Sequence, residues 1–171
     1  MASITIRRHG MTKPRPSSHG HEPLPSSRKI LGPEHAWTPR VLSILRISTA
    51  FLFMLHGSAK ILHLPYLPQY NELSPLSLVG VAGLLELIGG FLVLIGLFTR
   101  PVAFILSGEM AVAYFMSHAP QAVLPLLNRG DSAVLYCFVF LYLAFAGPGP
   151  WSADAMWRTR RDVTSRGRGA A

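Results

Sequence analysis

Residues 40–64 form a long apolar segment that also carries charge, and this combination restricts the fold of the chain more than any other feature. At about 1.5 Å of rise per residue, such a helix reaches roughly 35 Å, enough to cross a bilayer. Arg46 and Lys60 fall on one stripe of it, with His56 at the edge. Snorkelling to the interface accounts well for Lys60, near the outer end, but less well for Arg46, which lies deeper. Because a charge facing lipid is costly, we expect this stripe to face protein or water.

The composition indicates a membrane protein. Half of the 171 residues are hydrophobic and only 14% are charged, whereas a soluble domain carries about 25% charged residues. The net charge of +8 comes largely from basic segments at the two ends of the chain. Such flanks orient membrane proteins and contact anionic lipid, so we expect the lipid bilayer, and no nucleic acid, as partner. Cys137 is the only cysteine, which excludes an internal disulfide, a CxxC redox pair and a thiolate metal site.

Four apolar segments predict an all-α fold, a polytopic membrane four-helix bundle with spans near residues 40–63, 75–98, 101–118 and 131–147. We expect a disordered basic tail over residues 1–38, a four-helix transmembrane domain over 39–150, and a second disordered basic tail over 151–171. Thr38-Pro39 and Ser74-Pro75 each combine an N-cap residue with a proline that can start a helix.

The distribution of Lys and Arg predicts the orientation of these spans. Both tails and the turn at Arg100 are basic, and the other two connections hold only Arg129. The positive-inside rule therefore places both termini in the cytoplasm of a bacterial-type plasma (inner) membrane. All three tryptophans lie beyond span ends on that same side, as interface anchors do. Residues 1–39 lack the apolar core of a signal peptide, so the first span is expected to act as its own insertion signal.

Charged side chains lie inside the predicted spans and are the candidate site residues. Measured from the cytoplasmic ends, the helical rise places Arg46 about 9 Å deep, Glu109 about 13 Å, Glu86 about 18 Å and His56 about 24 Å. Lys60 lies near the outer face. Unpaired burial of these groups would be costly, so we expect Arg46 to lie within salt-bridge reach of Glu109 or Glu86. Glu86 can join either Arg46 or His56, and it is expected in a close helix contact because glycines flank it on its face.

The five residues Arg46, His56, Lys60, Glu86 and Glu109 allow more than one interpretation. They are either ion pairs that only fix the register of the helices, or a polar path or pocket for protons or a quinone-like head group. A haem held by His56 and His118 is a further alternative.

The chain has no phosphate-binding loop, no HExxH, no nucleophile elbow and no flavin or nicotinamide fingerprint. We therefore predict no cofactor within the chain itself, with a quinone left open, and no metal site. Cys137 and the tyrosines of the fourth span are assigned to packing.

The order of these residues resembles the DoxX family. The resemblance lies in Arg46, in the segment from His56 to Lys60, in the segment from Glu86 to Gly90, in residues 96–101, and in the Gly-Pro-Gly-Pro-Trp ending at 147–151. It covers about residues 40–154 and implies a four-helix membrane protein. Some family members serve as the membrane subunit of thiosulfate:quinone oxidoreductase, others occur with partners that handle oxidative or thiol stress, and distant relatives act in membrane-protein assembly.

Three hypotheses about function follow. The first is a redox-associated membrane subunit that offers a quinone-like or proton-handling site to a partner oxidoreductase. Such a chain would act in a homo- or hetero-oligomer with membrane or peripheral redox proteins, as a non-catalytic subunit of the complex. The second is a scaffold or assembly factor whose buried charges only hold the helices together. The third is a small transporter, which the lack of inverted repeats and broken helices disfavours.

Overall fold

The computed structural model describes residues 37–168, with side chains as far as residue 161, and contains no strand in this part of the chain. Five α-helices follow one another: α1 Thr38–Ile61, α2 Leu78–Ile95, α3 Thr99–Ala113, α4 Asp131–Ala146 and α5 Ala153–Arg168. A 3₁₀ turn, η3, covers Pro68–Tyr70, and a π-helical segment, η4, covers Tyr114–His118. The all-α fold is thus confirmed for the described residues. The predicted disordered segment 1–38 lies outside them, except for Trp37 and for Thr38, which begins α1.

Two of these helices, α1 and α2, are long and apolar enough to cross a membrane, and α4 is a shorter apolar helix. The helix predicted over 101–118 is present as α3 and η4 together, which follow one another without a break from Thr99 to His118. Large apolar side chains such as Phe51, Phe91, Phe104 and Phe138 are more than one-third exposed on all four helices. Exposed apolar surface on this scale is typical of contact with lipid. Four membrane crossings stay a prediction.

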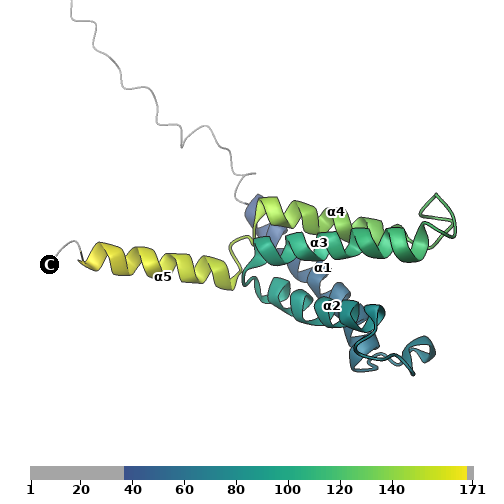
Figure 1. Ribbon diagram of the computed structural model, residues 1–171. Helices are drawn as coiled ribbons and strands as arrows, with labels where there is room; N and C mark the ends of the chain where they lie inside the picture. Colours follow the sequence, from purple (N-terminus) through teal and green to yellow (C-terminus); the bar gives the residue numbers. More distant parts are fainter. Residues whose placement is uncertain (1–36, 169–171) are drawn as a thin grey trace, which may run out of the picture. The chain divides into compact units, whose positions relative to one another are not determined.

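The first four helices pack mainly as two pairs, α1 against α2 and α3 against α4, with α2 also in contact with α3 (Figure 1). A core of apolar side chains joins the pairs. Phe53 of α1 lies with its ring centroid 4.7 Å from that of Phe140 of α4, and Val93 and Leu106 bring α2 and α3 into the same cluster. The start of α1, the turn between α2 and α3 and the connection from α4 to α5 lie at one end of these helices (Figure 1).

Helix α2 begins later than the sequence suggested. The predicted cap at Ser74-Pro75 is wrong, because Ser77 is the N-cap residue and its hydroxyl accepts a hydrogen bond from the Gly80 amide at 3.1 Å. A serine followed by proline and a serine three residues later are both acceptable caps, and only the second lies where the apolar face of α2 begins. At its other end α2 stops at Gly96, which has a left-handed backbone conformation.

The prediction of a disordered C-terminal tail is wrong for residues 153–168, which form α5. This segment is rich in arginine and poor in apolar residues, so its composition alone did not favour a fold. Its first turn is nevertheless fixed locally. The Ser152 hydroxyl accepts a hydrogen bond from the Ala155 amide at 3.2 Å, and Asp154 lies in the first turn, where a negative charge favours a helix.

Candidate functional site

Arg46 lies at the centre of a polar cluster at the end of the helices where α1 begins. Its side chain is fully buried, with 0% exposure, and its two terminal nitrogens donate to backbone carbonyls. Nη1 lies 3.1 Å from the carbonyl oxygen of Val93, and Nη2 donates to that of Trp151. Val93 belongs to the last turn of α2, and its carbonyl also accepts a hydrogen bond from the Gly96 amide at 3.1 Å. A cation is favourable there because the negative end of the helix dipole lies in the last turn. Arg46 thus fastens α1 to the end of α2 and to the connection before α5.

Gly96 provides the space that Arg46 occupies. A β-carbon at this position would lie 1.8 Å from Arg46 Nη1 and 2.4 Å from the β-carbon of Ser152. The backbone φ of Gly96 is +72°, a left-handed conformation that residues with a side chain adopt at a cost. Both the contact and the backbone angle therefore require glycine here.

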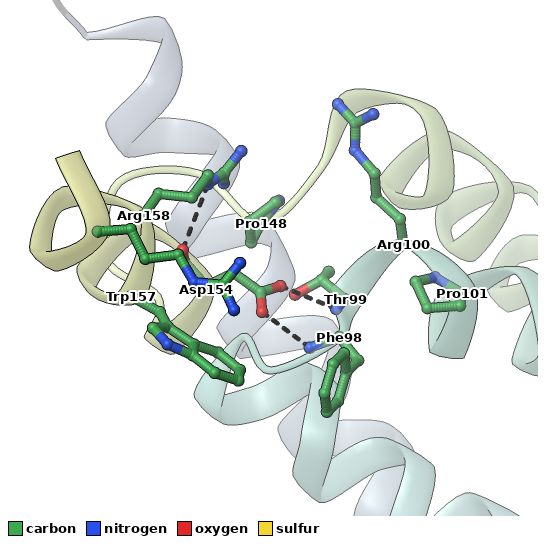
Figure 2. A pocket seen from close by; sticks show the side chains of 9 residues that line it. Phe98, Thr99, Arg100, Pro101, Pro148, Asp154, Trp157 and Arg158 are labelled. Atoms are coloured by element: carbon green, nitrogen blue, oxygen red, sulfur yellow. Dashed lines mark hydrogen bonds between the residues drawn. The ribbon is translucent and has the colours of Figure 1, made fainter. Parts of the chain in front are cut away.

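Asp154 completes this group, which we call the Arg46 cluster: Arg46, Gly96, Trp151 and Asp154. The two carboxylate oxygens of Asp154 accept hydrogen bonds from the amides of Phe98 and Thr99, each at 3.0 Å (Figure 2). Its own amide donates to the Gly96 carbonyl at 3.0 Å. Asp154 thus caps the start of α3 from a distance and provides a negative charge that acts on Arg46. The C-terminal segment is thereby joined to the turn between α2 and α3.

The expectation that Arg46 pairs with Glu86 or Glu109 is wrong. Glu86 instead forms a salt bridge with Lys60. Helical depth identified which charges lie at similar levels, but it took no account of backbone carbonyls as partners for a buried cation. The carbonyls of Val93 and Trp151 bind the two terminal nitrogens of Arg46 instead, with Asp154 as the nearby negative charge, while Nε has no hydrogen-bond partner in the described chain.

The second group, which we call the Lys60 cluster, contains His56, Lys60, Glu86, Glu109 and Tyr136. Lys60 Nζ lies 2.7 Å from each carboxylate oxygen of Glu86, and both side chains are largely buried. Lys60 therefore turns inward and does not snorkel to the interface. Glycine makes this possible, since a β-carbon on Gly83 would lie 2.8 Å from the β-carbon of Lys60. The predicted position of Glu86 in a close helix contact is confirmed.

Glu109 of α3 differs from every other carboxylate of the described chain. Both of its carboxylate oxygens are buried, and neither has a hydrogen-bond partner within the described residues. It lies within electrostatic range of Glu86 and Lys60. Lys60 is already engaged by Glu86 through both oxygens. The Lys60 cluster thus holds two carboxyl groups beside one lysine.

A cavity of about 250 Å³ adjoins this cluster and is lined by Leu52, Leu55, His56, Ala59, Pro65, Leu67, Tyr70 and Tyr136. The rings of His56 and Tyr136 meet edge to face, with centroids 5.8 Å apart. Both residues lie within electrostatic range of Glu86. His56 is exposed, at the edge of the cluster. Tyr136 was assigned to packing from the sequence, because the sequence does not show what an isolated tyrosine in an apolar helix contacts. The structure adds Tyr136 to the site.

His118 lies apart from this cavity lining. It ends η4, and its Nδ1 is 3.0 Å from the carbonyl oxygen of Asn128 in the connection to α4. Asn128 itself is buried and donates from its amide to the carbonyl of Ala122 at 2.7 Å. His118 thus takes part in ordering the connection between η4 and α4. A haem between His56 and His118 stays a prediction.

The two clusters lie within or beside a segment that matches known proteins. The sequence model of the DoxX family matches residues 41–119, which include Arg46, His56, Lys60, Glu86 and Glu109. The chain belongs to the DoxX family. The DoxX assignment confirms the resemblance noted from the sequence and identifies the chain as a membrane protein. Trp151 and Asp154 of the Arg46 cluster, and Tyr136 of the Lys60 cluster, lie beyond the matched residues.

A relative from Haemophilus influenzae, named only as an uncharacterized protein, is 42% identical over 122 residues. The alignment covers 69% of this chain and 91% of the relative. No solved structure matches the chain.

Proposed function

We propose that this DoxX protein is a redox-associated membrane subunit that offers a proton-handling, quinone-like site to a partner oxidoreductase. In this proposal the chain spans a bacterial-type plasma membrane with both termini in the cytoplasm. The observation that carries the proposal is Glu109, a buried carboxyl group without a hydrogen-bond partner in the described chain, beside a lysine that another carboxylate already engages.

Buried carboxyl groups inside membrane proteins commonly mark proton pathways. A group that no fixed hydrogen bond holds can gain and lose a proton without breaking the structure around it. The Lys60–Glu86 pair supplies a fixed polar environment next to it, and the cavity at His56 and Tyr136 offers room for a ring-shaped head group. The apolar remainder of the cavity lining suits such a ring.

The proposed chemistry divides the work between two proteins. Reduction of a quinone needs two electrons and two protons, one proton for each oxygen. The redox cofactor of the partner oxidoreductase supplies the electrons, since no cofactor is predicted within this chain. The Lys60 cluster supplies a route for protons, with His56 and Tyr136 at the cavity and Glu109 within electrostatic range of the Lys60–Glu86 pair. Glu109 then regains its proton from the aqueous side.

Photoaffinity labelling tests this assignment. The full chain in lipid nanodiscs is exposed to a quinone analogue that carries a photoreactive group, and the labelled peptides are identified. We expect label on the peptides that contain His56 and Tyr136. Leu55→Trp, which fills the cavity, should abolish the label. Leu45→Trp is the matched control, because Leu45 is a similarly exposed leucine of α1 that does not line the cavity.

A different outcome would favour the second function, a membrane scaffold or assembly factor. The observation that favours it is the closed geometry of the Lys60–Glu86 pair, which holds α1 against α2. Absence of label, or equal label on both tryptophan variants, would count against the quinone site. Purification of the native membrane complex then separates the two functions: a co-purifying oxidoreductase or quinone supports the redox subunit, and a co-purifying membrane protein without either supports the scaffold.

A further inference from the structure

A pocket of about 380 Å³ lies where α5 leaves the other helices, beside the turn between α2 and α3. The side chains that matter for the argument are those of Phe98, Arg100, Asp154, Trp157, Arg158 and Arg161. We call this the Arg100 pocket. It is separate from the cavity at His56 and shares no lining residue with it.

The Arg100 pocket is positively charged. Three arginines line it against a single carboxylate, Asp154. That carboxylate is already bound by the amides of Phe98 and Thr99 (Figure 2). Arg158 donates from Nε to the backbone carbonyl of Asp154 at 3.3 Å, and this neutral acceptor does not cancel the positive charge of the guanidinium. Within the described residues Arg100 forms no ion pair. The pocket therefore offers guanidinium groups in excess of the carboxylate charge.

The pocket is also aromatic. The rings of Phe98 and Trp157 meet edge to face with centroids 6.5 Å apart, and both side chains are about half exposed. The Arg161 guanidinium lies 5.0 Å from the centroid of the Trp157 ring. In the view of Figure 2 these two rings lie on one side of Asp154, and Arg158 and Arg100 lie on the other. A ligand that fits has a charged part and an apolar part.

The position of the pocket indicates which kind of apolar group the ligand carries. Phe104 lies one turn after Arg100 on the same face of α3, and its side chain is 63% exposed. Tryptophan beside arginine is the usual composition of a membrane–water boundary. An anionic group held at Arg100 would thus continue directly onto a surface that faces lipid.

We propose that the Arg100 pocket binds the phosphate of an anionic phospholipid headgroup, whose acyl chains run along α3 over Phe104. The arginines bind the phosphate, and the rings of Phe98 and Trp157 cover the glycerol region. Guanidinium groups suit this role because they bind phosphate oxygens through paired hydrogen bonds. Since Asp154 both lines the pocket and caps α3, a lipid bound there would also steady the junction of α5 with the other helices.

Native mass spectrometry of the full chain in detergent tests the proposal. The protein is titrated with phosphatidylglycerol and, separately, with phosphatidylcholine, and bound lipids are counted. We expect tighter binding of phosphatidylglycerol. Arg100→Gln and Arg158→Gln should each weaken that binding at least about tenfold, as expected when a charge-assisted hydrogen bond to a phosphate is lost. Arg158→Lys should retain part of it. Circular dichroism confirms that each variant keeps its helices.

Arg160→Gln is the matched control, since it removes the same charge from the same helix at a residue that does not line the pocket. It should leave the affinity for phosphatidylglycerol unchanged. A second arm adds excess inorganic phosphate, which should not displace the lipid, because a free anion makes no contact with the rings.

Three results would overturn the proposal. Equal affinity for the two lipids would remove the selectivity. An equal loss in Arg160→Gln would show attraction by diffuse charge and no defined pocket. Complete displacement by inorganic phosphate would indicate a site for a free anion. None of these results bears on the quinone site, which lies in a different cavity.

Discussion

The two buried polar clusters provide partners for their buried charged groups in different ways. In the Arg46 cluster the terminal guanidinium nitrogens donate to two backbone carbonyls, that of Val93 in the last turn of α2 and that of Trp151 in the connection before α5, and Asp154 binds backbone amides close by. In the Lys60 cluster the lysine binds both carboxylate oxygens of Glu86, and Glu109, within electrostatic range of both, has no hydrogen-bond partner in the described chain. The first arrangement fixes helices and turns. The second leaves one group able to change its proton, which is why we place the proposed function there.

The largest expected effect is the loss of Arg46. Arg46→Met leaves the Val93 and Trp151 carbonyls without their cation and Asp154 without the nearby charge. We expect the free energy of unfolding in detergent to fall by about 4 kcal/mol, because two buried hydrogen bonds from a charged group are lost, each worth about 1.5–3 kcal/mol. Arg40→Met is the control, since it makes the same change at an exposed position of α1 and should cost less than about 0.5 kcal/mol. Similar losses in both variants would contradict a structural role for the Arg46 cluster.

Much of the Arg46 cluster could not be predicted from the sequence. Span lengths and proline positions placed α1 and the helix from Thr99 to His118 to within two or three residues. The pattern also marked Arg46 as a charge that faces inward. Its partners were missed because hydrogen-bond acceptors at a helix end belong to the backbone and leave no trace in residue type. Asp154 was missed for a related reason: it lies in a segment whose composition favours disorder, and only its contacts with Phe98 and Thr99 show its role.

More of the Lys60 cluster could be predicted from the sequence, but the prediction was incomplete. Glycines on the same face of α2 as Glu86 indicated a close helix contact, and the structure has Gly83 against Lys60. The partner of Glu86 was not identified, because Lys60 near a helix end fits snorkelling and pairing equally well. Which carboxylate the lysine joins depends on the packing of α1 against α2, and a single sequence does not define that packing.

The second effect concerns the Lys60–Glu86 pair. Lys60→Met leaves Glu86 buried without a cation, and Glu86→Met leaves Lys60 without an anion, so each should lower the free energy of unfolding by about 3 kcal/mol. The double variant should recover part of that loss, because neither charge is then stranded. Chemical unfolding in detergent measures the cycle. Strict additivity of the two single losses would show that the 2.7 Å contact contributes nothing.

The third effect distinguishes glycines that differ in their surroundings. Gly96→Ala places a β-carbon against Arg46 and requires a strained backbone angle, so we expect a loss of about 2 kcal/mol. A β-carbon at Gly108 of α3 meets nothing within 4 Å. Gly108→Ala should therefore be neutral or should stabilise by up to about 1 kcal/mol, as expected of alanine in a helix. Thermal unfolding of the two variants side by side measures the difference. Equal melting temperatures would mean that Arg46 does not occupy the space at Gly96.

The smallest effect on stability is expected at Glu109, and it tests the comparison most directly. Glu109→Gln keeps the size of the side chain and removes its capacity to carry a proton. Because no hydrogen bond or ion pair is lost within the described residues, the free energy of unfolding should change by less than about 1 kcal/mol. Quinone-linked turnover of the complex with its partner should nevertheless fall at least about tenfold, as expected when a proton-transfer group is removed, while labelling by the quinone analogue persists.

Leu45→Trp, remote from the cavity, is the control and should change neither the free energy of unfolding nor the turnover. A loss of stability comparable to that of Arg46→Met would show that Glu109 has a structural partner, and the contrast between the two clusters would then fail. Full turnover with unchanged stability would leave the contrast in place and remove Glu109 from the proton route.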